Sequence, residues 1–327
     1  MPKATTKKTP KTKRAATKLA CPVCRSSNTR IIRRGVREDL VRPVFACAHC
    51  RLQFIEPPYK DLRSYYQEQY RLEHDNALGK ALTSEERYAL MRPLQADSAR
   101  RFKDLVPPGA SVLEIGCSAG FFLDAIGDGY DKFGCEWNTE DAAFVRDVGE
   151  IPCEEGQITD IYPGQQFTAI AACQVLEHQT DPIQFLRDCK ERLIGGGYLY
   201  LEIPNALDAM VSVYGVEEYR DFWYREPHIT YWQKETLASV LGALGFEAKV
   251  GVMQRYGILN HVNWLLNRVP MEDVHLARLY LSPVDQKHPV AGYLNRQLSR
   301  IDKEYRTTLE AIGAADTLVA SGARREI

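Results

Sequence analysis

Apolar and polar positions along this chain form two patterns, which predict two kinds of element. Short segments at residues 112–115, 132–136, 151–153 and 167–173 predict strands. The last of them is nearly all apolar, as expected of a parallel strand that is buried on both faces. Strands that alternate with amphipathic helical segments predict an α/β fold with a parallel sheet at its centre.

The first of these strands leads into the most informative loop of the sequence. The strand carries Glu114, and glycines follow at Gly116 and Gly120 before a new helix begins. Such a loop places backbone N–H groups at the carboxyl end of a parallel strand, where open α/β sheets bind ligands. The dinucleotide-binding fingerprint requires glycine where this chain has Ser118 and Phe121, which argues against a nicotinamide enzyme. A buried strand–turn–helix unit without a ligand is the alternative interpretation of this loop alone.

The loop resembles motif I of class I S-adenosylmethionine-dependent methyltransferases. The resemblance implies that Glu114 helps to hold the loop and the methionyl end of the cofactor, while Gly116 and Gly120 let the backbone approach the ligand. Glu136 ends the second predicted strand, twenty residues after Gly116. A carboxylate at this place can accept hydrogen bonds from both ribose hydroxyls, and a solvated loop charge is the alternative.

Two further segments, in the correct order along the chain, strengthen this resemblance. The fourth strand is followed by Val-Leu-Glu-His at residues 175–178 and then by Asp181 and a proline, which cap and begin a helix. Residues 227–232 and 244–246 resemble the loop and the sixth strand of one large methyltransferase group, which acts mostly on small molecules, sugars and quinone-type substrates. The resemblance covers about residues 95–255. It implies a Rossmann-like, seven-stranded methyltransferase sheet with helices on both faces.

The resemblance also implies which residues contact the cofactor. The glycine loop supplies the methionyl side and the end of the second strand supplies the ribose side. After the third strand, Gln157 offers an edge contact to the adenine and Ile158 an apolar contact. The full set of implied cofactor contacts is Glu114, Gly116, Cys117, Ser118, Gly120, Phe121, Glu136, Trp137, Gln157, Ile158 and Gln174.

Two histidines are the candidate bases for removing a proton from the methyl acceptor. His178 follows the fourth strand at the carboxyl edge, and a structural role in bracing the loop is its alternative. His228 lies near Tyr224 and Glu226 in a second candidate catalytic cluster. In deoxysugar C-methyltransferases, which the chain resembles, a Tyr-x-Glu-His cluster near this place handles the sugar. Here one residue is inserted between Glu226 and His228, and Arg225 can pair with a phosphate or carboxylate of the substrate.

Two Cys-x-x-Cys units predict a metal-binding domain, a zinc ribbon, in the first part of the chain. Cys21 and Cys24 form the first unit, and Cys47 and Cys50 form the second, 22 residues further on. Four thiolates can surround a tetrahedral zinc ion and leave no open position, so the predicted metal is structural. Redox pairs or unpaired thiols are the alternative. The intervening apolar residues predict a hairpin whose second strand continues through residues 51–54.

The predicted ribbon adds a resemblance to one group of methyltransferases. Deoxysugar C-methyltransferases carry an N-terminal domain with paired knuckles beside the active site, in the order seen here. They are longer, with an additional C-terminal domain that a chain of 327 residues does not accommodate at full size. The resemblance therefore implies methyl transfer, but it leaves oxygen, carbon and nitrogen open as the acceptor atom.

Composition and charge set the remaining bounds. The chain is 45% hydrophobic and 26% charged, as soluble globular proteins are, and no apolar run is long enough to span a membrane. Residues 1–20 carry seven Lys or Arg and no acid, which predicts a disordered basic tail, while the rest carries 35 basic and 43 acidic side chains. No apolar segment follows the basic stretch, as a secretory signal requires, and the cysteine pattern fits a reducing compartment. The expected location is therefore the cytoplasm.

These observations predict five regions. In chain order they are a basic tail (1–20), a zinc ribbon (21–56), a helical cover (57–105), the cofactor-binding core (106–255) and a helical insertion with the last strand (256–327). We expect the last strand, near residues 316–321, at an edge of the sheet. The insertion is expected either to cap the substrate pocket or to form a homodimer contact.

The leading hypothesis is an S-adenosylmethionine-dependent methyltransferase that acts on a small polar metabolite, with a sugar or nucleotide-linked sugar favoured. The transfer would be in-line, with His-assisted deprotonation of the acceptor. The alternative is a tRNA, rRNA or DNA methyltransferase that docks through the ribbon and the basic tail. An acidic body and the lack of an Asn/Asp-Pro-Pro-aromatic loop argue against it. A third hypothesis is a scaffold that binds the cofactor without turnover.

Overall fold

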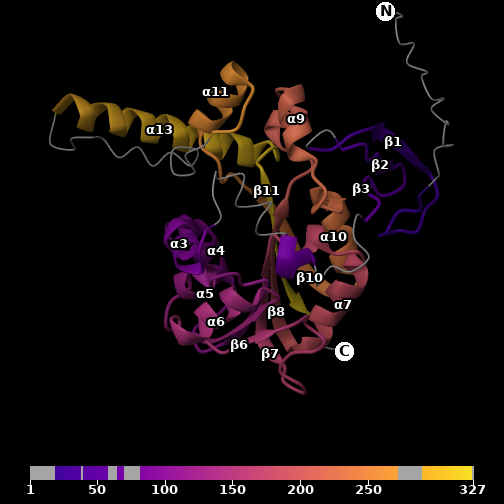
Figure 1. Ribbon diagram of the computed structural model, residues 1–327, viewed down its shortest axis with the longest axis vertical. Coiled ribbons are helices and arrows are strands. Elements are labelled where there is room, and N and C mark those ends of the chain that lie inside the picture. Colours follow the sequence, from indigo (N-terminus) through magenta and orange to yellow (C-terminus); the bar gives the residue numbers. More distant parts are fainter. Residues whose placement is uncertain (1–18, 38–39, 58–64, 70–81, 272–288, 326–327) are drawn as a thin grey trace, which may run out of the picture.

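The computed structural model describes residues 19–37, 40–57, 65–69, 82–271 and 289–325. Its centre is a seven-stranded sheet with the strand order β10-β11-β8-β7-β4-β5-β6, and a four-stranded sheet with the order β1-β2-β3-β9 lies to its side (Figure 1). The predicted α/β fold with a Rossmann-like seven-stranded sheet is therefore confirmed. Residues 1–18 of the predicted basic tail, and residues 58–64 and 70–81 of the expected helical cover, lie outside the described residues.

Five parallel strands form most of the large sheet. They are β4 (Ser111–Ile115), β5 (Asp131–Glu136), β6 (Cys153–Glu155), β7 (Phe167–Cys173) and β8 (Leu193–Pro204). β7 is buried along almost its whole length, as its apolar sequence predicts. The third strand begins at Cys153, whereas residues 151–153 were expected to form it, because only the residues from Cys153 onward pair with β5.

The last strand is not at an edge, and this prediction is wrong. β11 (Thr317–Arg324) lies between β8 and β10 (Phe246–Met253) and pairs antiparallel with both. Leu318 packs into the core on one face and Val319 into the core on the other, which is the environment of an internal strand. The edge position belongs to β10, whose burial alternates along most of its length.

Helices cover both faces of the large sheet (Figure 1). One face carries α3 (Ser84–Met91), α4 (Ala96–Leu105), α5 (Phe121–Ala125) and α6 (Thr139–Asp147); the other carries α7 (Pro182–Arg192) and α10 (Lys234–Ala243). Phe102 and Phe122 pack into the core of the first face, and Leu186 and Leu237 into the core of the second. The Asp181 side chain accepts from the Gln184 N–H at the start of α7, as the capping pattern predicted.

The shorter helices and the insertion gather near the carboxyl ends of the strands. They are η1 (Tyr65–Gln69), η2 (Arg92–Gln95), η3 (Leu176–His178), α8 (Ala209–Ser212), α9 (Glu217–Trp223), α11 (Ile258–Asn267) and α13 (Pro289–Ala311). α11 and α13 connect β10 to β11, so the insertion stands over the ligand-binding edge of the sheet (Figure 1). Among the described residues, no helix has the length and apolar character needed to cross a membrane.

Three short strands and the two Cys-x-x-Cys units form the ribbon. The strands are β1 (Thr29–Arg33), β2 (Val44–Cys47) and β3 (Gln53–Ile55). We expected residues 51–54 to continue β2, and this prediction is wrong. The turn that contains Arg51, at φ 65°, reverses the chain, so that β3 pairs antiparallel with β2. β3 pairs in turn with β9 (Thr230–Tyr231), which lies far along the chain beside the predicted base His228.

Candidate active site

Two positions that favour glycine shape the loop between β4 and α5. Gly116 has a φ of 68° and Gly120 a φ of 75°, both in the left-handed region. A Cβ at Gly116 would lie 2.8 Å from Cγ2 of Val175, and a Cβ at Gly120 would lie 3.0 Å from Cγ2 of Val145. The loop therefore packs against the segment after β7 that leads to His178.

Glu136 joins this loop to the end of β5. Its Oε2 accepts a hydrogen bond from the Ser118 N–H at 2.8 Å, and its Oε1 accepts from the N–H groups of Trp137 at 2.8 Å and Asn138 at 2.9 Å. Burial raises the pKa of this carboxyl, and the backbone donors act in the opposite direction. With one donor bound, Oε2 keeps the capacity to accept a second.

Glu114 and Asp141 add two buried carboxyl groups beneath the loop. Glu114 is almost fully buried, and burial, with the charge of Glu136 as the next cause, raises its pKa well above the ordinary value. Asp141, on α6, accepts from Oγ of Ser118 at 3.3 Å and lies 3.8 Å from Nε of Arg87. Sequence reasoning missed Asp141, whose one signal was an acid in the first turn of the helix after β5.

The other predicted cofactor residues differ in their burial and backbone conformation. Gln174 follows β7 directly with a left-handed backbone, at φ 60°, and Phe121 begins α5. Cys117 is buried in the loop. Ile158 is buried in the core cluster and Gln157 is exposed, so the two predicted adenine contacts differ in environment.

The two candidate bases lie together although they are far apart in the sequence. The rings of His178 and His228 are 4.9 Å apart and nearly perpendicular, at 85°. Nδ1 of His178 lies 2.6 Å from the Pro227 carbonyl oxygen, so Nδ1 carries the hydrogen and Nε2 is the basic nitrogen. Arg225 donates to Nε2 of His228 from Nε at 3.0 Å and from Nη2 at 2.6 Å. In both rings Nε2 is thus the nitrogen without a hydrogen, and in His228 this nitrogen is bound to Arg225.

Tyr66 links this histidine pair to the end of β5. Its ring centroid lies 5.9 Å from that of His178 and 5.6 Å from that of Trp137, with edge-to-face geometry in both contacts. Trp137 directly follows Glu136, the acid bound to the glycine loop. An aromatic row therefore runs from the end of β5 to the two histidines.

Glu177 is the residue of this cluster that sequence reasoning left without a role. It has no exposed surface, and its Oε1 lies 3.8 Å from Nε2 of His178. Burial raises the pKa of this carboxyl to about 8. The Val-Leu-Glu-His motif contained Glu177 but carried no signal for where its side chain would point.

Tyr224 and Glu226, the other predicted catalytic residues, contact the ribbon. The hydroxyl of Tyr224 donates to Oε1 of Gln53 at 2.5 Å, and Oε1 of Glu226 accepts from Nε of Arg42 at 2.6 Å. Burial raises the pKa of Tyr224 to about 12. Their catalytic role stays a prediction, and their observed contacts hold the ribbon to the loop that carries His228.

The four ribbon cysteines converge on one point. The Sγ atoms of Cys21 and Cys50 are 3.5 Å apart, as are those of Cys24 and Cys47, and all four lie within 4.8 Å of one another. A tetrahedral zinc with bonds of about 2.3 Å would separate its sulfur ligands by about 3.8 Å. The residues present therefore fit a four-coordinate metal ion.

The ribbon is tied to the segment of the histidine pair by backbone and side-chain bonds. The Ile55 N–H donates to the Ile229 carbonyl at 3.0 Å, beside the pairing of β3 with β9. The Thr236 hydroxyl donates to the carbonyl oxygen of Cys50, a knuckle residue, at 2.6 Å. The position of His228 thus depends on the ribbon.

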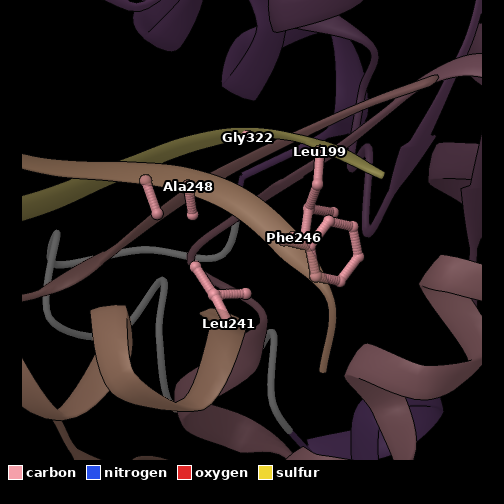
Figure 2. Close-up of a pocket in the computed structure, with 6 residues that line it drawn as sticks. Leu199, Leu241, Phe246, Ala248 and Gly322 are labelled. Atoms are coloured by element: carbon pink, nitrogen blue, oxygen red, sulfur yellow. The ribbon is translucent and has the colours of Figure 1, made fainter. Parts of the chain in front are cut away.

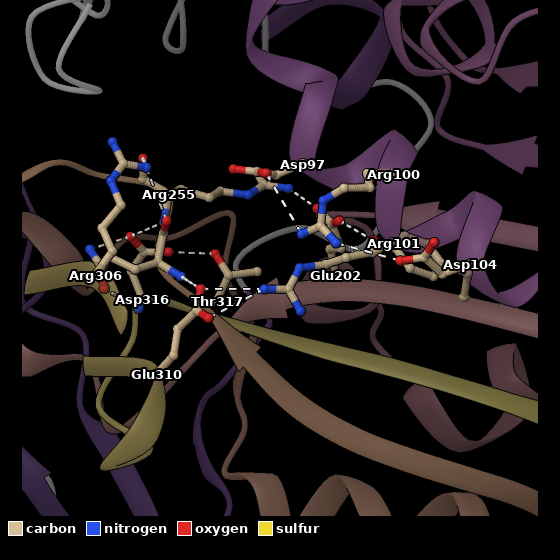
Figure 3. A network of polar contacts seen from close by, with 12 residues as sticks. Asp97, Arg100, Arg101, Asp104, Glu202, Arg255, Arg306, Glu310, Asp316 and Thr317 are labelled. Atoms are coloured by element: carbon tan, nitrogen blue, oxygen red, sulfur yellow. Dashed lines mark hydrogen bonds and ion pairs between the residues drawn. The ribbon is translucent and has the colours of Figure 1, made fainter. Parts of the chain in front are cut away.

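A buried ionic network holds the ends of β8, β10 and β11 at the same edge (Figure 3). Arg255 pairs with Glu202, which also accepts from the hydroxyls of Tyr200 at 2.5 Å and Ser98 at 3.1 Å. Asp316 accepts from the Arg255 N–H at 2.9 Å. None of these residues was predicted, because their partners come from distant segments.

A small gap between α10 and the sheet belongs to the core and not to the site (Figure 2). Its lining is wholly apolar and consists of Leu199, Leu241, Phe246, Ala248, Ala320 and Gly322. No polar group in this lining could orient a ligand, and the polar clusters described above lie elsewhere.

Comparison with known proteins identifies the family to which this chain is similar. Residues 84–249, half of the chain, match the family described as a methyltransferase domain. A tRNA U34 carboxymethyltransferase of Hydrogenovibrio crunogenus is 33% identical over 113 residues, which are 30% of this chain and 34% of that protein. A ubiquinone biosynthesis O-methyltransferase of Pseudomonas aeruginosa is 28% identical over 163 residues, or 46% of this chain and 68% of the relative.

The chain spans only part of most of these relatives. The first curated relatives are covered over 34%, 40% and 50% of their own length. Among solved structures, a SAM-dependent methyltransferase of Archaeoglobus fulgidus aligns with 79% of this chain and 100% of its own, at 16% identity and a TM-score of 0.48.

Proposed function

The chain belongs to the methyltransferase domain family, and from this membership we propose that it transfers the methyl group of S-adenosylmethionine to a small polar metabolite. One observation carries the proposal: a glycine loop bound to Glu136 is joined through Tyr66 to a buried histidine pair. The glycine loop with Glu136 is suited to bind a nucleoside, and the histidine pair is suited to remove a proton from an acceptor.

The cofactor side is assigned to the residues of the loop and of the β5 end. Gly116 and Gly120 let the backbone come close to the ligand, and Oε2 of Glu136 accepts from a ribose hydroxyl. Asp141 and Glu114 hold the loop from below. When bound, the cofactor supplies a methyl group already activated on a sulfonium, so the chain mainly has to orient the acceptor.

The acceptor is proposed to be small, with a sugar or a nucleotide-linked sugar as the favoured class. His178 and His228 are only 5% and 7% exposed, so an acceptor must enter an enclosed site to reach them. The insertion of α11 and α13 stands over this edge and supports a capping role. The ribbon fused before the methyltransferase domain is the further feature that the sugar-modifying group shares.

His178 is the better placed of the two candidate bases. The Pro227 carbonyl fixes the hydrogen on Nδ1, so Nε2 can accept the proton of a hydroxyl as the methyl group is transferred. Nε2 of His228 already accepts from the Arg225 guanidinium, which makes that nitrogen a poorer base. In this scheme His228 and Arg225 orient the acceptor.

The ribbon is proposed to hold one structural zinc ion through Cys21, Cys24, Cys47 and Cys50. Four sulfur ligands leave no position for a substrate, so the ion acts on stability. Because β3 pairs with β9, the stability of the ribbon is passed on to the loop of His228.

Methylation of tRNA is the second candidate function. It is favoured by the similarity, over 30% of this chain, to a tRNA U34 carboxymethyltransferase. Docking of an RNA would rely on the seven basic side chains among residues 1–20. Such binding weakens steeply with salt, since phosphate contacts release counterions.

The two candidates are separated by assaying the purified chain with labelled S-adenosylmethionine against a panel of sugar nucleotides and against unmodified tRNA. We expect label in a sugar nucleotide, and no loss of this activity when residues 1–20 are deleted. His178→Gln should keep cofactor binding by calorimetry and lose turnover by about 100-fold or more. Label in tRNA alone, abolished by the deletion, would make the second candidate correct.

A further inference from the structure

Glu177 has an environment that a buried carboxylate rarely has. Neither of its oxygens accepts a hydrogen bond from any residue that the structure describes, and the side chain has no exposed surface. Its contact with Nε2 of His178, at 3.8 Å, is too long for a hydrogen bond. Buried charges in proteins are normally paired or bound to a metal ion, so the ionised form of this carboxyl group would be stabilised by a cation.

Two imidazoles meet the carboxylate at the same point. One ligand atom each from Glu177, His178 and His228 lies within 4.8 Å of the other two, and all three residues are buried. A tetrahedral metal with bonds of about 2.0 to 2.1 Å would separate an imidazole nitrogen from a carboxylate oxygen by about 3.3 Å. The 3.8 Å observed for His178 and Glu177 is within half an ångström of that spacing.

The surroundings of His178 support the same assignment. Its Nδ1–H donates to the Pro227 carbonyl, which fixes the ring and directs the lone pair of Nε2 toward Glu177. Ligating histidines characteristically donate their other ring nitrogen to a carbonyl or carboxylate in this way.

We propose that Glu177, His178 and His228 form a second metal site, distinct from the four-cysteine cluster, that binds a first-row divalent transition metal. Two imidazoles and one carboxylate are the donor set of catalytic zinc and of related ions, whereas magnesium and calcium take oxygen ligands. Three protein ligands leave a coordination position open for a water or for an acceptor oxygen. His178 then has two exclusive states, as a ligand or as a base.

Arg225 is the built-in competitor for this site. Its guanidinium donates to Nε2 of His228 from Nε at 3.0 Å and from Nη2 at 2.6 Å. A dication beside this guanidinium is repelled, and a neutral ring that accepts at Nε2 keeps its hydrogen on Nδ1. Metal binding therefore displaces Arg225 from His228, and removal of the guanidinium should tighten the binding of the ion.

The experiment uses the full chain with its four-cysteine cluster loaded with zinc, and titrates it with Co²⁺. We expect one further Co²⁺ per chain, with d–d absorption but without the thiolate charge-transfer band that a cysteine site produces. Glu177→Gln and His228→Gln should each weaken this Co²⁺ by about 100-fold or more, while Arg225→Gln should strengthen it about tenfold. His261→Gln, a change at another buried histidine, is the control and should leave the second ion bound.

The result does not depend on the proposed function, because binding is read by absorption and by metal content rather than by turnover. Zinc retained in the cysteine cluster and an unchanged far-UV spectrum show that each variant is folded. A wild-type chain that takes up no second ion overturns the proposal. So does a second ion that survives in the Glu177→Gln/His228→Gln double variant.

Discussion

The cofactor side and the acceptor side of the carboxyl edge are built in opposite ways. The cofactor side comes from one stretch, β4 to α6, in which Glu136 binds Ser118 and Asp141 binds the same residue. The acceptor side is assembled from the segment after β7, from the residues around His228 and from the ribbon, which are brought together by long-range pairing such as that of β3 with β9. Substitutions elsewhere in the chain are therefore expected to leave cofactor binding intact. Substitutions in any of the three segments of the acceptor side are expected to lower turnover.

Loss of the metal ion proposed for the ribbon should have the largest effect, and it should affect the acceptor side but not the cofactor side. We expect Cys47→Ser to lower turnover by about 100-fold or more while S-adenosylhomocysteine still binds, because structural zinc contributes about 10 kcal/mol or more to a small domain. Calorimetry and hydrogen exchange at residues 224–232 check this. His49→Ala, in the same knuckle but exposed, is the matched control and should change neither. Equal loss of cofactor binding would show that the sides are not separate.

Gly116→Ala should damage the cofactor side. The new Cβ would lie 2.8 Å from Val175 at a left-handed φ, and the combined strain of about 2 to 3 kcal/mol should weaken S-adenosylhomocysteine by about 100-fold. Gly109→Ala is the control, since Gly109 has a φ of 84° but nothing within 4 Å of its Cβ. Calorimetry on both variants compares backbone strain alone with strain plus the close contact with Val175. Similar losses of affinity in the two variants would contradict a role of that contact.

Glu177 should give the acceptor side a pH dependence that the cofactor side lacks. Because burial raises its pKa to about 8, the folded chain holds a proton that the unfolded chain has released above its ordinary pKa. Stability should fall by a few kcal/mol as the pH rises from about 5 to about 8, and Glu177→Gln should remove this fall. Urea unfolding without added metal measures it. If the stability of the wild-type chain and of Glu177→Gln changed in the same way with pH, Glu177 would not be the group responsible.

The smallest effect is expected at Glu136, the residue proposed to bind the ribose. Glu136→Ala should weaken S-adenosylhomocysteine about tenfold, or about 1.4 kcal/mol, since it removes an acceptor and the anchor of the Ser118 N–H. Glu155→Ala, on the neighbouring strand β6, is the control and should bind normally. Unchanged affinity in calorimetry would reject the ribose role of Glu136.

The same division explains what could be predicted from the sequence. The strands, the glycine loop and the approach of Glu136 to that loop follow from local patterns, because each depends on residues close together in the chain. The internal position of β11 could not be predicted, since a strand rich in small residues looks the same in the middle of a sheet as at its edge. The contacts of Glu177, Tyr224 and Glu226 depend on which distant segment lies opposite each side chain.

The strand shared by the ribbon and the core has a consequence for how the chain is made. The ribbon leaves the ribosome before β9, which lies far behind it in the sequence. Until Thr230 and Tyr231 arrive, β3 has an open edge that can pair with a neighbouring chain. A nascent ribbon is thus a site for misassembly, and a fragment ending before β9 should associate with itself, whereas the whole chain closes that edge internally.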